Sequence, residues 1–175
     1  MTHTDEHLSA LSNQFGSKLL VAEVSEPTRL RVQVHKSDLV EVMRFIAEMG
    51  FSVLESISGV DWETHFEIVY HVDRWDGDPT VIQISIHIQD RKNPVFPSVI
   101  SVWQSADWHE REVYDLFGIQ VEGHPNLKRL LLPEEWDEYD HVDMTALYPM
   151  RRDYQLPEKP FQYKPRPPLE EGSEL

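Results

Sequence analysis

The spacing of apolar residues predicts two helices within the first fifty residues. Apolar residues recur at three- and four-residue intervals over residues 8–15, and Gly16 follows where a helix would end. The clearer helix begins after Ser37, which is placed to cap it, and stops at Gly50. One face of this second helix is apolar: Leu39, Val42, Met43, Ile46 and Met49. Such a stripe predicts a helix that packs one side against a core.

Five segments with apolar residues at alternate positions are predicted as strands. In the clearest, Thr80–Asp90, four isoleucines at every second position face one way and polar residues face the other. Asp76-Gly77 marks a hairpin before it, in a loop longer than two residues. The segments are Lys18–Val24, Thr28–His35, Phe51–Ser58, His65–Asp73 and Thr80–Asp90. The order of elements predicts an α+β fold, in which helices pack on one face of an antiparallel or mixed sheet.

A further helical region is predicted from Ser98 to Phe117, after a proline-containing turn at residues 93–97. Ser105 is placed to restart the helix as a cap, and Gly118 would close it. The expected buried stripe consists of Ala106, His109, Val113, Leu116 and Phe117. This helix is predicted to join the same core as the sheet.

Charged residues follow this helix at four-residue spacing. Asp107, Arg111 and Asp115 stand at i, i+4 and i+8, so Arg111 can pair in either direction. On a solvated surface such a pair contributes only a few tenths of a kcal/mol. Buried at an interface, the planar guanidinium would instead orient a partner.

The last third of the chain differs in composition from the rest. Six of the twelve prolines lie from Pro149 onward, and proline cannot continue a helix or enter a central strand. Large apolar side chains recur among them: Tyr148, Tyr154, Leu156, Phe161 and Tyr163. We therefore expect an N-terminal helix and first strand in residues 1–28, an α+β domain in 29–132, and an acidic loop followed by an extended arm in 133–175. The arm is predicted to wrap a partner and to become ordered on binding.

Composition and charge exclude several functional classes. A net charge of −15 argues against nucleic acid and against anionic lipid as direct partners. The absence of cysteine excludes disulfides, a cysteine nucleophile and a thiolate-ligated iron–sulfur cluster on this chain. No signal-peptide pattern and no apolar run of about 20 residues is present. We expect membrane contact only through partner proteins.

A cluster of carboxylates and histidines raises a metal-hydrolase alternative, with Glu110, Glu112 and His124 as ligands. The spacing disfavours it, because His109-Glu110 lacks the second histidine of a zinc-binding helix and Glu110 and Glu112 point to different helix faces. Ion pairing is the favoured interpretation of these charges. Gly123-His124-Pro125 is most simply a turn.

In this order, the residues resemble the 30 kDa subunit family of respiratory complex I, the NADH-quinone oxidoreductase. The signature of that family is Glu-Arg-Glu, two residues, an acid, two apolar residues, six residues, His, three residues, a basic residue, one more residue and two aliphatic residues. The chain meets it at every position: Glu110-Arg111-Glu112, Asp115, Leu116-Phe117, His124, Lys128 and Leu130-Leu131. The resemblance covers roughly residues 29–154.

One segment departs from the family pattern. The family has Gly-His-Pro-Leu-Arg-Lys-Asp followed by an aromatic residue and proline, whereas this chain has Leu147-Tyr148-Pro149-Met150-Arg151-Arg152-Asp153-Tyr154. An acidic segment near residues 137–146 looks inserted before it. Since the Pro-x-basic-basic-Asp core is kept, we expect the arm to dock with a locally different corner.

The resemblance implies a non-catalytic subunit of the peripheral arm of a proton-translocating enzyme, on the cytoplasmic face of the membrane. Its expected partners are the large quinone-site subunit and the small iron–sulfur subunit. This chain is expected to carry no cofactor, whereas the parent complex implies FMN, iron–sulfur clusters, NADH and quinone. An equivalent subunit of a ferredoxin-dependent enzyme or a membrane-bound hydrogenase is the alternative. The interface residues implied by the resemblance are Glu110, Arg111, Glu112, Asp115, His124, Pro125, Lys128, Arg151, Arg152 and Asp153.

Overall fold

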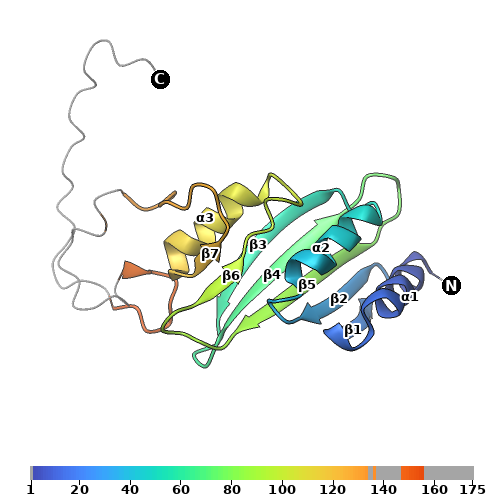
Figure 1. Cartoon of the computed structure of the whole chain (residues 1–175), viewed down its shortest axis with the longest axis horizontal. Helices are drawn as coiled ribbons and strands as arrows, with labels where there is room; N and C mark the ends of the chain where they lie inside the picture. The colour runs from blue at the N-terminus through green and yellow to red at the C-terminus, as the bar shows by residue number, and fades with distance from the viewer. Residues whose placement is uncertain (1, 134–135, 137–146, 156–175) are drawn as a thin grey trace, which may run out of the picture.

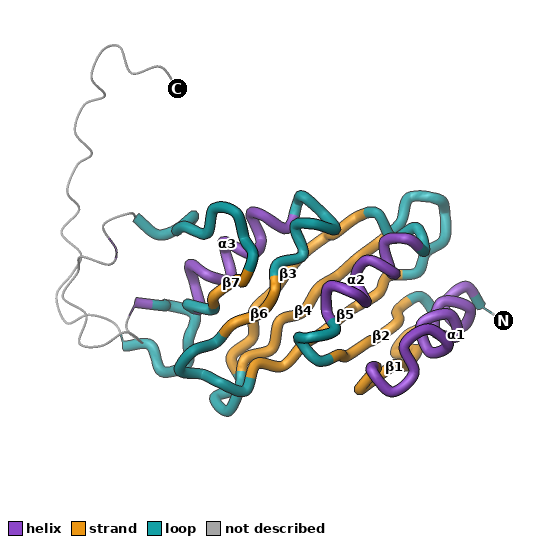
Figure 2. The backbone as a smooth tube through the Cα atoms, in the orientation of Figure 1, coloured by secondary structure: helices purple, strands orange, loops and turns teal. Residues whose placement is uncertain are grey.

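The computed structural model describes residues 2–133, 136 and 147–155, which form helices on a twisted sheet (Figures 1 and 2). The helices are α1 (His3–Phe15), α2 (Leu39–Glu48) and α3 (Ala106–Phe117), and a short 3-10 turn at Gly16–Lys18 follows α1. The strands are β1 (Leu19–Glu26), β2 (Arg29–Val34), β3 (Val53–Asp61), β4 (Phe66–Asp73), β5 (Val81–Ile88), β6 (Val95–Pro97) and β7 (Gln120–Glu122).

The main sheet is mixed. Its strand order is β1-β2-β5-β4-β3, with a parallel pairing between β2 and β5 and antiparallel pairings elsewhere. Helix α2 connects β2 to β3 and therefore crosses over the two strands that lie between them (Figure 1). Strands β6 and β7 form a separate parallel pair beside α3. The α+β class and the mixed sheet were both predicted and are confirmed.

The helices lie on one face of the sheet, and the core fills the space between them (Figure 1). The alternate isoleucines of β5 are almost completely buried there, as are four residues of the apolar stripe of α2: Leu39, Val42, Met43 and Ile46. Met49, the fifth residue of the predicted stripe, follows the helix as its C-cap and is half-buried. At about 25 cal/mol per Å² of apolar surface, this burial is the main stabilising contribution. Gly59 of β3 allows α3 to approach closely, because a Cβ at that position would lie 2.8 Å from the ring of Phe117.

Local boundaries differ from the sequence prediction in three places. Asp38, rather than Ser37, is the N-cap of α2, and neither it nor Ser105 of α3 makes a side-chain capping bond. The region that begins at Ser98 forms turns, and the helix itself begins only at Ala106. Strands β6 and β7 were not predicted, since three residues are too few to show a period of two.

Most of the predicted arm, residues 133–175, lies outside the described residues. Residues 147–154 are described, and they pack back onto the domain as a strap across the C-terminal end of α3. A small cluster of apolar side chains supports the strap: Leu132, Trp136, Leu147 and Tyr148.

Candidate functional site

The predicted site lies along α3, and its first residue, Glu110, is completely buried. One carboxylate oxygen accepts the backbone N–H of Val99 at 2.7 Å, and the other accepts the hydroxyl of Ser98 at 2.7 Å. Burial raises the pKa of the Glu110 carboxyl, although these two hydrogen bonds act in the opposite direction. Glu110 therefore ties the turn before α3 to the helix itself.

Asp115, further along α3, is also completely buried. Its Oδ2 accepts three successive backbone N–H groups, those of Leu130, Leu131 and Leu132, at 3.0, 2.6 and 2.9 Å. Its Oδ1 accepts a guanidinium N–H of Arg129 at 2.8 Å. Burial would raise the pKa of Asp115, but the backbone donors and Arg129 outweigh that effect and lower it.

Arg111 binds the same segment from the preceding turn of the helix. It donates from Nε to the carbonyl of Lys128 at 3.2 Å and from Nη2 to the carbonyl of Arg129 at 3.0 Å. Its guanidinium carbon lies 5.4 Å from the ring centre of Trp108. The predicted pairing of Arg111 with Asp107 or Asp115 is wrong, because Arg111 donates to backbone carbonyls and Asp115 accepts from backbone amides and Arg129.

His124 closes the other end of this segment. Its Nε2 lies 3.3 Å from both the carbonyl oxygen and a carboxylate oxygen of Asp107, while Nδ1 accepts the N–H of Asn126 at 3.0 Å. Residues 124–132, the bracing segment, are thus held along α3 by side chains of the signature. Of the remaining signature residues, Pro125 and Lys128 are exposed and Glu112 is half-buried.

The strap packs against the C-terminal end of α3 and bonds to it. The ring of Tyr148 lies against Gly118, where φ is +67° and a Cβ would overlap the tyrosine ring. The N–H of Met150 donates to the carbonyl of Leu116 at 3.1 Å. The strap therefore satisfies carbonyl groups that a helix end leaves without partners.

The basic pair of the strap is anchored on the chain itself. The N–H of Arg152 donates to Asp61 at 3.0 Å, and its guanidinium lies 2.9 Å from Glu63. Arg91 forms two hydrogen bonds with Asp61 and lies 3.6 Å from Asp153. The contacts described for the basic pair lie within the domain, and its predicted anchoring to a partner stays a prediction.

Several residues on which this arrangement depends were not predicted from the sequence. Asp61 and Arg91 stand at or near the ends of strands with no motif around them, and Gly59 acts only through the ring that lies against it. Gly118 was predicted to close α3, which is confirmed by its left-handed C-cap, but its contact with Tyr148 was not predicted. A glycine within an otherwise regular strand was the one available signal, since it often marks a close approach of another group.

Three large apolar side chains, one each on α3, the bracing segment and the strap, remain in solvent. Trp108 is 62% exposed, Leu131 60% and Met150 55%. Each is attached to a fixed part of the site: Trp108 contacts Arg111, Leu131 is bonded through its N–H to Asp115, and Met150 is bonded to α3. We call these three residues the exposed apolar set.

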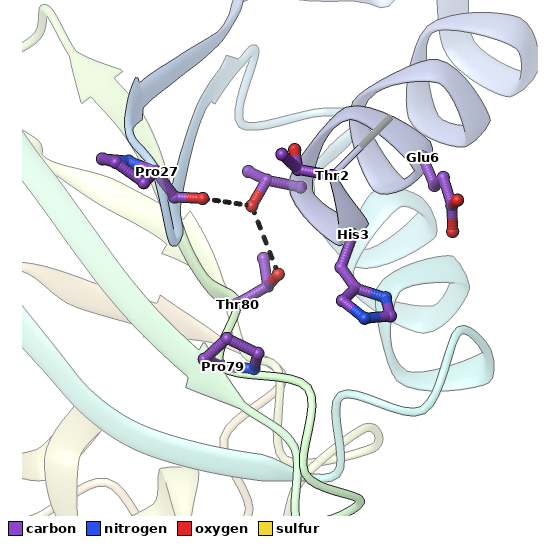
Figure 3. Close-up of a pocket in the computed structure, with 7 residues that line it drawn as sticks. Thr2, His3, Glu6, Pro27, Pro79 and Thr80 are labelled. Atoms are coloured by element: carbon purple, nitrogen blue, oxygen red, sulfur yellow. Dashed lines mark hydrogen bonds between the residues drawn. The ribbon is translucent and has the colours of Figure 1, made fainter.

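A cavity of about 270 Å³ lies elsewhere, between the N-terminus of α1 and the turns that precede β2 and β5 (Figure 3). The hydroxyl of Thr4 donates to the carbonyl of Pro27 at 2.8 Å and lies 3.4 Å from the hydroxyl of Thr80 (Figure 3). These bonds join α1 to the sheet. The cavity thus lies where α1 packs against the sheet, and its bonded residues have a structural role.

The metal-hydrolase alternative finds no ligand set in the part of the chain that the structure describes. No group of three or more histidine, aspartate or glutamate side chains is placed there to hold a metal ion. Both carboxylate oxygens of Glu110 already accept hydrogen bonds from protein groups.

Comparison with known families matches residues 32–160 to one described as the 30 kDa subunit of respiratory-chain NADH dehydrogenase. The chain belongs to this family. The matched range contains α3, the bracing segment and the strap, so the predicted resemblance is confirmed over the part of the chain that carries the signature.

Two similar proteins are subunits of enzymes of this kind. The chain is 34% identical over 151 residues to the C subunit of F(420)H(2) dehydrogenase from Methanosarcina mazei, covering 85% of this chain and 89% of the relative. It is 36% identical over 134 residues to the C subunit of NADH-quinone oxidoreductase from Roseiflexus sp. (strain RS-1), covering 73% and 70%. With the family match, these relatives make the chain a subunit of a complex I-like enzyme.

Solved structures show the same fold. A trypsin-resistant fragment (1-134) of Nqo5 superposes with a TM-score of 0.60 at 30% identity, covering 70% of this chain and 98% of the fragment. A chain of the membrane-bound sulfane sulfur reductase, an archaeal respiratory membrane complex, gives 0.72 at 23% identity, covering 87% and 85%. Among residues 2–133, 136 and 147–155, no helix combines the length and apolar character needed to cross a bilayer.

Proposed function

We propose that this chain is a non-catalytic assembly subunit in the peripheral arm of a proton-translocating NADH-quinone oxidoreductase. The observation that carries the proposal is the exposed apolar set, three large side chains held in solvent by a rigid frame. Tryptophan is enriched among the residues that contribute most to protein–protein binding. A surface fixed before binding also loses less conformational entropy when a partner docks.

The family signature supports this role indirectly. Glu110, Arg111 and Asp115 are buried and bonded within the chain, so their function is to hold the docking surface in place. Direct contact with a partner falls to exposed neighbours such as Trp108 and Lys128. The interface assignment of the signature as a whole stays a prediction.

The proposed partners are the large subunit that helps form the quinone site and the small subunit that carries the terminal iron–sulfur cluster. In this proposal FMN, the iron–sulfur clusters and the NADH and quinone sites belong to other subunits, consistent with a chain that has no cysteine. The complex would hold the chain on the cytoplasmic face of the membrane, with no membrane contact of its own.

Purification of the tagged chain from its own membranes in mild detergent tests this proposal. We expect mass spectrometry to identify flavin, iron–sulfur and multi-span membrane subunits in the same complex. Recovery of the chain alone from intact, active membranes would refute the proposal.

Two exposed tryptophans allow a matched test of the docking surface. Trp108 lies on α3, whereas Trp75, 85% exposed, lies in the loop between β4 and β5 at the opposite end of the sheet (Figure 1). We expect Trp108→Ser to weaken association by at least about 2 kcal/mol, roughly thirty-fold, and Trp75→Ser to have no effect. Quantitative mass spectrometry of the purified complex measures both, and equal effects of the two substitutions would contradict the assignment.

A second candidate concerns the electron donor. The similarity to the C subunit of F(420)H(2) dehydrogenase extends over 85% of this chain, so a complex I-like enzyme with a donor other than NADH is the alternative. The ferredoxin-dependent and hydrogenase versions belong to the same alternative. The purified complex distinguishes them, because an NADH-oxidising module is present only in the first case.

A further inference from the structure

Arg151 of the strap is held in one position by three contacts. Its guanidinium carbon lies 5.1 Å from the ring centre of Phe66 and 5.0 Å from that of Tyr148. Its Nε donates to the carbonyl of Phe117, the last residue of α3, at 2.6 Å. The side chain is half-buried as a result. Both aromatic rings are themselves buried, which fixes the orientation of the guanidinium.

Among the residues that the structure describes, this guanidinium has no carboxylate partner. No aspartate or glutamate in that part of the chain lies within ion-pair distance of Arg151, and its two terminal nitrogens make no hydrogen bond there. Its neighbours differ, because Arg91 pairs with Asp61 and Arg152 pairs with Glu63. Burial lowers the pKa of Arg151, although the charges of Asp153 and Asp61 act in the opposite direction.

The contacts within the chain use only some of the groups of the Arg151 side chain. The negative end of the α3 dipole and the two ring faces favour a cation at this place. They use Nε and the flat faces of the guanidinium, and they leave the terminal nitrogens available. Those nitrogens form the fork that binds a carboxylate with two parallel hydrogen bonds.

We propose that Arg151 receives a carboxylate side chain from a neighbouring subunit of the complex. This inference rests on the proposed function and names the chemistry of the partner at this point. An acidic protein side chain fits better than a small anion because Met150, the adjacent residue, is 55% exposed and would need an apolar surface to cover it. The chain as a whole carries a net charge of −15, which would repel an acidic partner. Around the strap, however, three basic and three acidic side chains balance one another: Arg91, Arg151 and Arg152 against Asp61, Glu63 and Asp153. An acidic side chain can therefore approach at this place.

The test compares Arg151→Met with Arg152→Met in the full-length tagged chain. Methionine keeps an apolar stem between the two rings and removes the charge, while Arg152 is a neighbouring arginine whose side chain is 57% exposed and paired with Glu63. Each variant replaces the native chain in its own cells, and its retention in the purified complex is measured over a series of salt concentrations. The thermal unfolding midpoint of each isolated chain is measured in parallel.

We expect Arg151→Met to weaken retention at least about thirty-fold, the loss typical of removing one partner of a buried charge pair. The isolated chain's midpoint should fall only slightly, because one hydrogen bond to the carbonyl of Phe117 is lost. Arg152→Met should behave as the wild type in both measurements. Unchanged retention of Arg151→Met overturns the inference while the proposed function stands. A midpoint so low that the isolated variant is unfolded at the temperature of the purification also overturns it, because the lower retention would then reflect loss of the domain's own fold. If the wild-type chain recovers no partner subunits, the proposed function and this inference fail together.

Carbodiimide coupling then identifies the acid. The substitution Arg151→Lys places an amine at the same position, and the reagent joins amines to carboxylates without a spacer. A cross-link to an aspartate or glutamate of another subunit supports the inference. A cross-link to a carboxylate of this chain overturns it.

Discussion

Replacing Asp115 tests whether one side chain holds the whole bracing segment against α3. In the variant Asp115→Ala, the N–H groups of Leu130, Leu131 and Leu132 and the guanidinium of Arg129 all lose their common acceptor. Each hydrogen bond to a charged group contributes about 1.5–3 kcal/mol, but water can reach part of the segment once the carboxylate is gone. We therefore expect a total loss of about 3–5 kcal/mol, the range measured when one partner of a buried pair is removed.

Such a loss is a large fraction of the roughly 5–15 kcal/mol that stabilises a domain, so the segment should open before the sheet unfolds. Urea unfolding measures the total loss, and hydrogen exchange of the amides of residues 130–132 measures the local opening. Glu112→Ala on the same helix is the control, since Glu112 is half-buried and makes no bond among the described residues. The control should change stability by less than about 0.5 kcal/mol. Equal losses for the two variants, or unchanged exchange at residues 130–132, would refute this account of the brace.

The same contact has a defined dependence on pH. The pKa of Asp115 is lowered in the folded state, so its contribution is present above the unfolded pKa of about 3.9 and is lost as pH falls through the folded pKa. The variant Asp115→Asn should therefore differ most from the wild type near neutral pH and least at strongly acidic pH.

Two further predictions concern Glu110 and Gly118. Burial raises the pKa of Glu110, so this residue stabilises the fold below its unfolded pKa of about 4.3, and its contribution is lost as pH rises through the folded pKa. Glu110→Gln should therefore gain stability relative to the wild type as pH rises from 4 to 8. A difference in the free energy of unfolding between the two proteins that stays constant over this range, measured by urea unfolding, would contradict this. Gly118→Ala should cost about 1–3 kcal/mol by displacing Tyr148, whereas Gly123→Ala, with φ of +82° but open space around it, isolates the cost of backbone strain alone; equal midpoints for the two variants would exclude the clash.

The fold was predictable where burial leaves a period in the sequence. The stripe of α2 and the alternate isoleucines of β5 each face one continuous apolar surface, so spacing alone located them. The sequence also showed where along the chain the site lies, but it did not show which groups its side chains contact. Asp115 appeared as one member of an i, i+4 series, yet its partners are backbone amides 15–17 residues away in a segment with no period. Contacts between a side chain and distant backbone leave no pattern of residue types, and the strap on Gly118 is hidden for the same reason.

The parallel pairing at the centre of the sheet has a consequence for how the chain folds during synthesis. Strand β2 is bonded to β5, so Arg29 meets Val81, a residue 52 positions later in the chain. The first two strands can form a hairpin as they leave the ribosome, but they cannot join the rest of the sheet until β5 has been made. Pairings between distant segments fold slowly because the intervening chain must close into a loop first. The N-terminal hairpin therefore stays apart from the rest of the sheet until about half of the protein exists, and during this interval the edge of β2 that later bonds to β5 has no partner strand.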